Sequence, residues 1–284
     1  MINALLLCGA AVGISAQNVV KKYYNKKTDR HGVFIFASTS ALVACLFFLV
    51  ASGFNLDLRA EVIPYSIGFA ASYAAASVGS FLAIQAGSLS LTSLINSYSL
   101  IIPTFYSLIF FGEEVGVTFW IGFALLMVSL FLINSREGEV KITPKWIIFV
   151  VIGFLGNGIC STVQAAEQRD FSGAYKSEFM VMALTLVALS LFITSLCTER
   201  DCMRDCVKRG GHLMVSCGVA NGAVNLFIML LLVRMSAALI YPIISAGGIL
   251  LSWAVSRFLY KEKLTKKQNL ALVLGIVSVV LMNL

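Results

Sequence analysis

The chain has 284 residues, of which 59% are hydrophobic and only 12% are charged, and its mean hydropathy is +0.90. A soluble domain carries about 25% charged residues, so this composition excludes a soluble protein and predicts a polytopic membrane protein. The net charge of +7 could suit a nucleic acid, but the basic residues cluster between apolar runs, which points instead to the surface of a lipid bilayer and to no nucleic-acid partner.

Five apolar runs of about 20 residues, the length of a membrane-spanning helix, occupy the first half of the chain. Gly9, Gly13 and Gln17 share one face of the first run, so that helix can pack closely on a neighbour within the chain or on a second copy in a homodimer. The second run is rich in Phe and Leu and is predicted to face lipid, and the third has small residues that must press against a neighbour or border a cavity. The five predicted helices span residues 2–20, 32–51, 62–85, 86–114 and 115–134.

The pattern restarts after a linker at residues 135–145, with predicted helices at 146–166, 177–196, 212–233 and 234–262 and a final apolar run. Residues 86–114 and 234–262 align at a shift of 148 positions and match at seven of 29 positions, ending on Glu114 and Glu262. An internal repeat of this kind decides the architecture. The chain therefore divides into a first five-helix unit at 1–134 and a second at 146–284.

Five is an odd number, so the second unit must enter the bilayer inverted relative to the first. The fold class is then an all-α polytopic membrane protein with ten transmembrane helices in two inverted five-helix repeats. Seventeen of the 21 Lys and Arg fall on one side of this arrangement, and the positive-inside rule makes that side cytoplasmic. We expect an integral protein of the cell membrane, here a bacterial inner membrane, with both termini outside the cytoplasm.

Three features resemble the drug/metabolite transporter superfamily, specifically its ten-helix EamA-like family. They are the small-residue run AASYAAAS at 70–77, the Ser-rich joint into the fourth helix, and the corners FFGEEVGV at 110–117 and LYKEKLTKKQ at 259–268. Val115 and Gly116 depart from the family's corner, whereas the second corner fits it. The resemblance implies a secondary transporter in which the first, third, fourth, sixth, eighth and ninth helices surround a central pathway and the fifth and tenth lie outside. Many members have cytoplasmic termini, and the charge distribution here predicts the reverse.

No Asp, Glu, Lys or Arg is predicted in the central part of any span. Buried ionisable groups are the usual basis of proton-coupled transport and of sites for charged substrates. Their absence predicts a neutral or zwitterionic small-molecule substrate, such as an amino acid, moved by alternating access. The expected substrate-binding residues are polar groups near mid-span or beside the Pro242 bend; interhelical hydrogen bonding is their competing role. They are Tyr73, Ser77, Asn96, Tyr98, Asn157, Asn221, Asn225 and Tyr241.

Four further residues could gate the pathway. Gln17 and Gln164 are expected near opposite ends of the membrane, as gates or as contacts to lipid headgroups. Pro103 and Pro242 can bend their helices, either as hinges or as static kinks. Glu114 and Glu262 are expected to be structural, since an acid favours the N-terminus of the helix that follows it.

No motif indicates an enzyme, a cofactor or a metal site. Cys197, Cys202 and Cys206 cluster in a predicted loop near His212, but their spacing matches no zinc or iron–sulfur pattern. Two other functions stay open. The first is a transporter of organic cations or quaternary amines through an aromatic cage of Tyr73, Tyr98 and Tyr241, and the second is a non-transporting membrane protein, such as a lipid flippase subunit or a sensor.

Overall fold

The computed structural model describes residues 2–28, 31–86, 95–96, 98–113, 115–134, 143–260 and 266–282. Within these ranges the chain is helical and has no strand, and six helices are long and apolar enough to cross a membrane. This confirms the expected all-α membrane protein. The elements are α1 (Ile2–Lys27), α2 (Val33–Ala51), the short η1 (Ala60–Val62), α3 (Ile63–Ala86), α5 (Ile101–Phe110), α6 (Val117–Asn134), α7 (Pro144–Asp170), α8 (Lys176–Thr198), α9 (Arg200–Leu232), α10 (Ala237–Tyr260) and α11 (Lys266–Met282).

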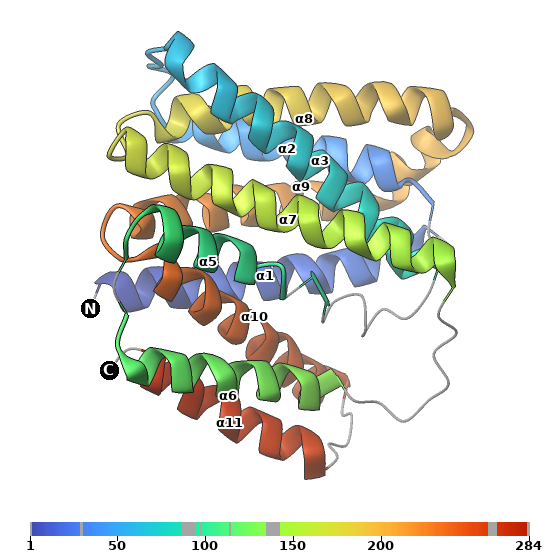
Figure 1. Cartoon of the computed structure of the whole chain (residues 1–284). Helices are drawn as coiled ribbons and strands as arrows, with labels where there is room; N and C mark the ends of the chain where they lie inside the picture. Colours follow the sequence, from blue (N-terminus) through green and yellow to red (C-terminus); the bar gives the residue numbers. More distant parts are fainter. Residues whose placement is uncertain are drawn as a thin grey trace.

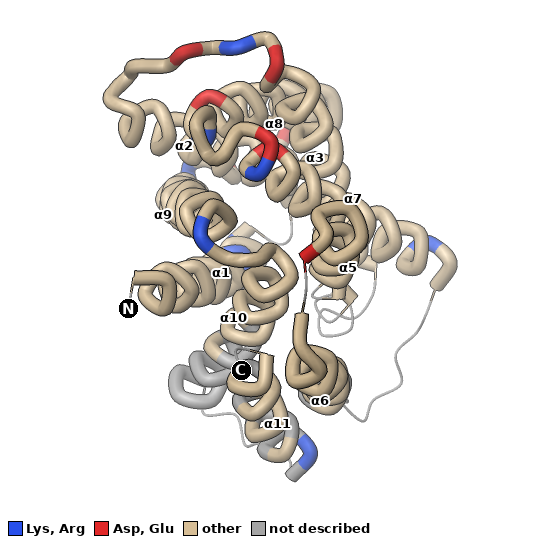
Figure 2. The backbone as a smooth tube through the Cα atoms, turned by 60° about the vertical axis from the view of Figure 1, so that its left-hand side comes forward, with Lys and Arg blue, Asp and Glu red and all other residues tan. Residues whose placement is uncertain are grey.

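Successive helices run in alternating directions, so the connections gather at two ends of the bundle (Figure 1). Both termini lie at one end, with the connections at residues 52–62, 111–116, 171–175 and 233–236. We call this the terminal end and the opposite one the basic end. Figure 2 shows the charged residues on connections and near helix ends. Among the described residues, four Lys and Arg lie at the terminal end: Arg59, Arg169, Lys176 and Arg234.

The small residues of α3 press against α7, which settles the choice left open by the sequence. A Cβ added at Gly79 would lie 2.7 Å from the backbone nitrogen of Gly153, and one added at Gly156 would lie 2.6 Å from that of Ala76. Such close backbone approach is typical of small-residue helix interfaces in membranes. Gly9 and Gly13 of α1 likewise face side chains of α9. That face of α1 is therefore used inside the chain.

The second helix was predicted to face lipid, and α2 does so on one face only, where Leu42, Leu46 and Val50 are exposed. α2 packs against α8 and α9, and Phe48, three residues before its end, is fully buried in the same hydrophobic cluster as Phe179 and Leu184 of α8. Large apolar side chains suit a helix–helix interface as well as they suit lipid. The sequence pattern therefore does not distinguish a packed helix from a lipid-facing one. α6 and α11 pack mainly on each other and form a separate pair at one edge of the bundle (Figure 1).

The fourth predicted helix, expected to be continuous over 86–114, is interrupted. Residues 87–94 and 97 lie outside the described residues, and Ser99 and Leu100 form a turn before α5 begins at Ile101. Pro103 supplies the physical reason, because it has no N–H to donate to the carbonyl of Ser99. The Ile102 N–H donates to that carbonyl instead at 3.0 Å, which tightens the chain into a turn.

Two helices extend beyond their predicted bounds, with consequences for chemistry. α7 continues to Asp170, so Glu167 is a fully buried carboxylate within a spanning helix. Glu167 lies in the last turn of α7, outside the central part of the span that was predicted to be free of charged residues. α9 begins at Arg200, so Cys202 and Cys206 are helical residues and lie in no loop.

Carboxylates do cap helix N-termini, but each one caps a helix that is distant from it in the sequence. Glu113 accepts hydrogen bonds from the backbone N–H groups of Ala237 and Ala238, both at 3.2 Å, and from the Ser236 hydroxyl at 2.6 Å. It therefore holds the start of α10. Glu199 holds the start of α2 in the same way, through the backbone N–H groups of residues 34 and 35. The expected caps Glu114 and Glu262 lie outside the described residues.

Candidate functional site

A polar stripe on α7 organises the candidate site. Asn157, Ser161, Gln164 and Gln168 are spaced by four, three and four residues, which places them on one face of the helix. Gly153 and Gly156 bring the start of this face against α3. Along this face, Asn157 is hydrogen-bonded to the Ser99 turn, Ser161 to α10 and Gln164 to α9.

The first part of the site is a network, here called the tyrosine–asparagine network, formed by the half-buried Tyr73 and the buried Asn221, Asn225 and Gln164. The amide of Asn221 donates to the Tyr73 hydroxyl at 3.0 Å, and that of Asn225 donates to Asn221 Oδ1 at 2.9 Å. Gln164 Nε2 donates to Asn225 Oδ1 at 3.2 Å. Ser77 lies within hydrogen-bonding reach of Tyr73.

The network rises from the middle of the bundle toward the terminal end. Tyr73 lies ten residues into α3 and Asn221 eleven residues before the end of α9, so both lie about 15 Å from the terminal end. Asn225 and Gln164 lie closer to that end, seven and six residues before the ends of their helices. Four hydrogen-bonding side chains thus lie in the depth of the fold, where unsatisfied polar groups are strongly unfavourable.

The second part is a serine–asparagine cluster at the interrupted helix, formed by Ser80, Asn96, Ser99 and Asn157. Asn157 Nδ2 donates to Ser99 Oγ at 2.6 Å, and Asn96 Nδ2 donates to Ser80 Oγ at 2.8 Å. Asn96 Oδ1 is buried and accepts no hydrogen bond from the described residues. The turn at Ser99 therefore brings amide and hydroxyl groups of three helical segments together.

Tyr241 joins α10 to α7 between these parts and the terminal end. Its hydroxyl donates to the carbonyl oxygen of Ser161 at 2.7 Å, and its side chain is buried. Pro242 is buried inside α10, which continues through it. Together with Leu100 and Ile101, Pro242 lines a space of only about 10 Å³, so α10 and the start of α5 are closely packed.

A cavity of about 220 Å³ lies beyond Tyr241 at the terminal end. Its wall includes two charged groups, those of Glu113 and Arg169, together with the amide of Gln168. Arg169 donates to the carbonyl of Phe111 at 2.9 Å and its guanidinium lies 4.3 Å from the centre of the Phe111 ring. The remaining lining residues are Phe111, Ala165, Ser172, Leu232, Val233 and Ala237.

The structure separates the predicted site residues into groups. Tyr73, Ser77, Asn221 and Asn225 come together, as do Asn96 and Asn157. Gln164 lies six residues before the end of α7, and it is buried in the tyrosine–asparagine network, where its side chain has no contact with lipid headgroups. Gln17 is half-buried on α1, and nothing in the described part of the chain ties it to that network.

Tyr98 turns away from the site. Its hydroxyl donates to the carbonyl of Met127 on α6 at 3.3 Å, and its ring packs in the cluster between α6, α10 and α11. The Tyr73 hydroxyl thus accepts a hydrogen bond from α9, whereas those of Tyr98 and Tyr241 donate to α6 and α7. They do not gather into one cage.

Sequence reasoning missed Ser161, Glu167 and Gln168. The signal was present, since Asn157, Ser161, Gln164 and Gln168 repeat at helical spacing in an otherwise apolar segment. The helix was predicted to end at 166, so Gln168 fell outside the span and the repeat was not recognised.

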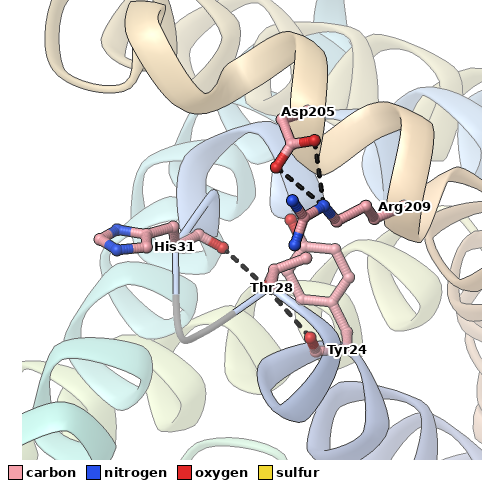
Figure 3. A network of polar contacts seen from close by, with 5 residues as sticks. All are labelled: Tyr24, Thr28, His31, Asp205 and Arg209. Carbon is pink, nitrogen blue, oxygen red and sulfur yellow. Dashed lines mark hydrogen bonds and ion pairs between the residues drawn. The ribbon is translucent and has the colours of Figure 1, made fainter.

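Cys206, near the basic end, has a packing role, whereas Cys197 is exposed. Cys206 is buried against Gly32 and Tyr24, and the Tyr24 hydroxyl donates to the Gly32 carbonyl at 2.9 Å. Figure 3 shows Thr28 closing the same connection, with its hydroxyl bonded to the backbone oxygens of Tyr24 and His31. No group of three His, Cys, Asp or Glu suited to a metal ion occurs among the described residues.

Comparisons with known proteins identify the fold alone. No protein-family model matches the chain, and no curated protein matches it. A solved structure described only as "Crystal structure of protein" superposes with a TM-score of 0.83 at 14% sequence identity, covering 99% of this chain and 98% of that chain. The helical arrangement described above is therefore similar, over its whole length, to one already observed in a crystal.

Proposed function

We propose that the chain is a secondary transporter that moves a small neutral or zwitterionic metabolite by alternating access. The observation that carries this proposal is the polar stripe of α7, which runs from the interrupted helix at Ser99 to the terminal-end cavity through an apolar bundle. Interrupted helices and polar groups near mid-membrane are features of transporter binding sites. An amino acid or related compound fits such an uncharged central site.

We also propose two inverted five-helix repeats and membership of the EamA-like drug/metabolite transporters. The pairing of helices supports the repeat. Each helix of the first repeat has a counterpart in the second: α1 and α7, α2 and α8, α3 and α9, α5 and α10, and α6 and α11. When every helix is replaced by its counterpart, each major helix–helix contact becomes another contact that the structure contains. Thus α3–α7 becomes α9–α1, and α2–α9 becomes α8–α3. Tyr73 and Asn221, related by the 148-residue shift, meet each other, as residues beside a two-fold axis do.

The alternatives predict different behaviour. An aromatic cage for organic cations needs several rings around one space, and the three tyrosine hydroxyls point to different helices. That geometry favours a neutral or zwitterionic substrate. A lipid flippase subunit or a sensor would require neither a solute pathway nor flux.

A ligand screen followed by flux tests the transport proposal. The purified protein is heated with amino acids, sugars, nucleosides, polyamines and quaternary amines, since a ligand present at about 100 times its Kd stabilises the folded state by about 2.7 kcal/mol. A neutral or zwitterionic compound that stabilises the protein is then assayed for uptake into proteoliposomes.

The test uses a matched pair of variants on α9. Asn221→Ala removes the hydrogen bond to Tyr73, whereas Ser216→Ala alters an exposed hydroxyl that bonds only within the helix. We expect Asn221→Ala to lose stabilisation and uptake and Ser216→Ala to retain both. Stabilisation by quaternary amines alone would favour the cation transporter, and the absence of any stabilising solute would favour a non-transporting protein.

We propose a bacterial inner membrane as the location, with the terminal end outside the cytoplasm. Cysteine labelling of intact cells tests this orientation in a background without the native exposed cysteines. Leu58 is exposed at the terminal end and Lys26 near the basic end. A cysteine at 58 should react with an impermeant reagent and one at 26 should not; the reverse pattern would contradict the proposed orientation.

A further inference from the structure

The carboxylate of Glu167 is buried without a positive partner. Glu167 is fully inaccessible and lies in the last turn of α7, and Gln168 beside it is almost as buried. Glu167 Oε2 accepts a hydrogen bond from Gln168 Nε2. The two other oxygens of this pair, Glu167 Oε1 and Gln168 Oε1, have no hydrogen-bond partner among the described residues.

The groups around Glu167 increase the need for a compensating positive charge. The C-terminal end of a helix carries a partial negative charge and favours cations, and Glu167 stands at that end of α7. Asp170 and Glu178 are the neighbouring acids. Lys176 is the nearby base, but its ammonium donates to the Gly173 carbonyl at 3.4 Å and forms no ion pair with Glu167 in the described structure. A buried charge left in this way is strongly unfavourable unless a cation compensates it.

The unpartnered atoms are both oxygens, which are the donors that hard cations take. One carboxylate balances one positive charge, and helix C-terminal ends and carbonyl oxygens are known to coordinate Na⁺ in transporters. An ion can approach through the terminal-end cavity, whose wall includes Gln168 and the exposed residues Arg169 and Ser172. From these observations we propose that Glu167 and Gln168 form a binding site for a monovalent cation, with Na⁺ as its occupant.

Ion binding at Glu167 and Gln168 does not depend on the protein being a transporter. If both proposals hold, Na⁺ bound at Glu167 is positioned one helical turn from Gln164 of the tyrosine–asparagine network. Binding of Na⁺ would then shift the conformational equilibrium of the end of α7 that borders the cavity.

Thermal unfolding of the purified full chain, with no solute added, tests the site. The Tm is measured in sodium chloride and in choline chloride at equal ionic strength. For the native sequence we expect Na⁺ to raise the Tm in a saturable manner. Glu167→Gln keeps the shape of the side chain and removes its charge, so we expect it to lose the Na⁺ response and to be more stable than the native protein in choline.

That crossover separates ion binding from a merely structural role, which would leave the variant less stable in both salts. Glu178→Gln is the matched control, because it neutralises a nearby, half-exposed acid and should retain the Na⁺ response. Equal Tm values in the two salts for the native protein, or an unchanged Na⁺ response in Glu167→Gln, would overturn the proposal. A stability that follows pH and ignores Na⁺ would assign the site to a proton and overturn it too.

Discussion

The contact between α3 and α7 yields the sharpest stability prediction, because two glycines in one interface should respond oppositely to the same substitution. A Cβ at Gly156 would lie 2.6 Å from Ala76 N, 2.7 Å from Ser72 O and 3.0 Å from Ala76 Cα. All three atoms belong to the backbone of α3 and cannot rotate aside. A Cβ at Gly68 would meet only the side chain of Val163, at 3.7 Å and 3.8 Å, which is ordinary van der Waals contact.

The magnitude follows from two opposing terms. Replacing Gly by Ala inside a helix favours the helix by up to about 1 kcal/mol, whereas overpacking a tight interface costs about 1–3 kcal/mol. Gly156→Ala experiences both terms, and because the obstacle is backbone we expect a net loss of about 1–2 kcal/mol. Gly68→Ala experiences only the first and should be neutral or slightly more stable.

Equilibrium unfolding in mixed detergent, followed by circular dichroism, measures this difference. Both variants change the same residue type to the same residue type, so effects on the unfolded state largely cancel between them. If Gly156→Ala proves as stable as Gly68→Ala, the close backbone approach of α3 and α7 is refuted, and with it the placement of the polar stripe against α3.

Two further substitutions test contacts that fasten the ends of the bundle. Glu113→Ala should cost about 1–2 kcal/mol of unfolding free energy, since it removes the cap of α10, whereas Glu61→Ala changes an exposed acid and should leave the denaturation midpoint unchanged. Gly32→Ala should destabilise more than Gly53→Ala. Both glycines have a positive φ, of 74° and 62°, but a Cβ at Gly32 would lie 2.6 Å from Cys206 Sγ and one at Gly53 would meet nothing within 4 Å. Equal losses in thermal unfolding for that pair would show that the connection to α9 is not tightly packed.

The sequence predicted the helices well for a simple reason. A chain inside a bilayer must satisfy its backbone hydrogen bonds internally, so long apolar segments form helices whatever their neighbours. The same reasoning predicted that small residues on the first and third helices mark close contacts. It did not identify the partners, because Gly9 contacts α9 and Gly79 contacts α7 only through the tertiary arrangement.

The candidate site was predictable in its residue types and unpredictable in its connections. Tyr73 and Asn221 are both among the predicted site residues, and the fold places them in direct contact. Tyr98, beside the turn at Ser99, has the same chemistry as Tyr73, yet its hydroxyl donates to α6. Which way a side chain points after an interrupted helix depends on the backbone of that turn, and a helical periodicity carries no such information.

The sequence by itself determined that this protein is a helical membrane protein with most of its basic residues at one end, because hydrophobicity and charge act residue by residue. Only the tertiary structure decided that Glu113 caps α10 and that Glu167 is buried. Both facts depend on helix ends that meet from distant parts of the chain. A carboxylate in a connection and one beneath a neighbouring helix look the same in a sequence, and they differ physically because only the second is removed from water.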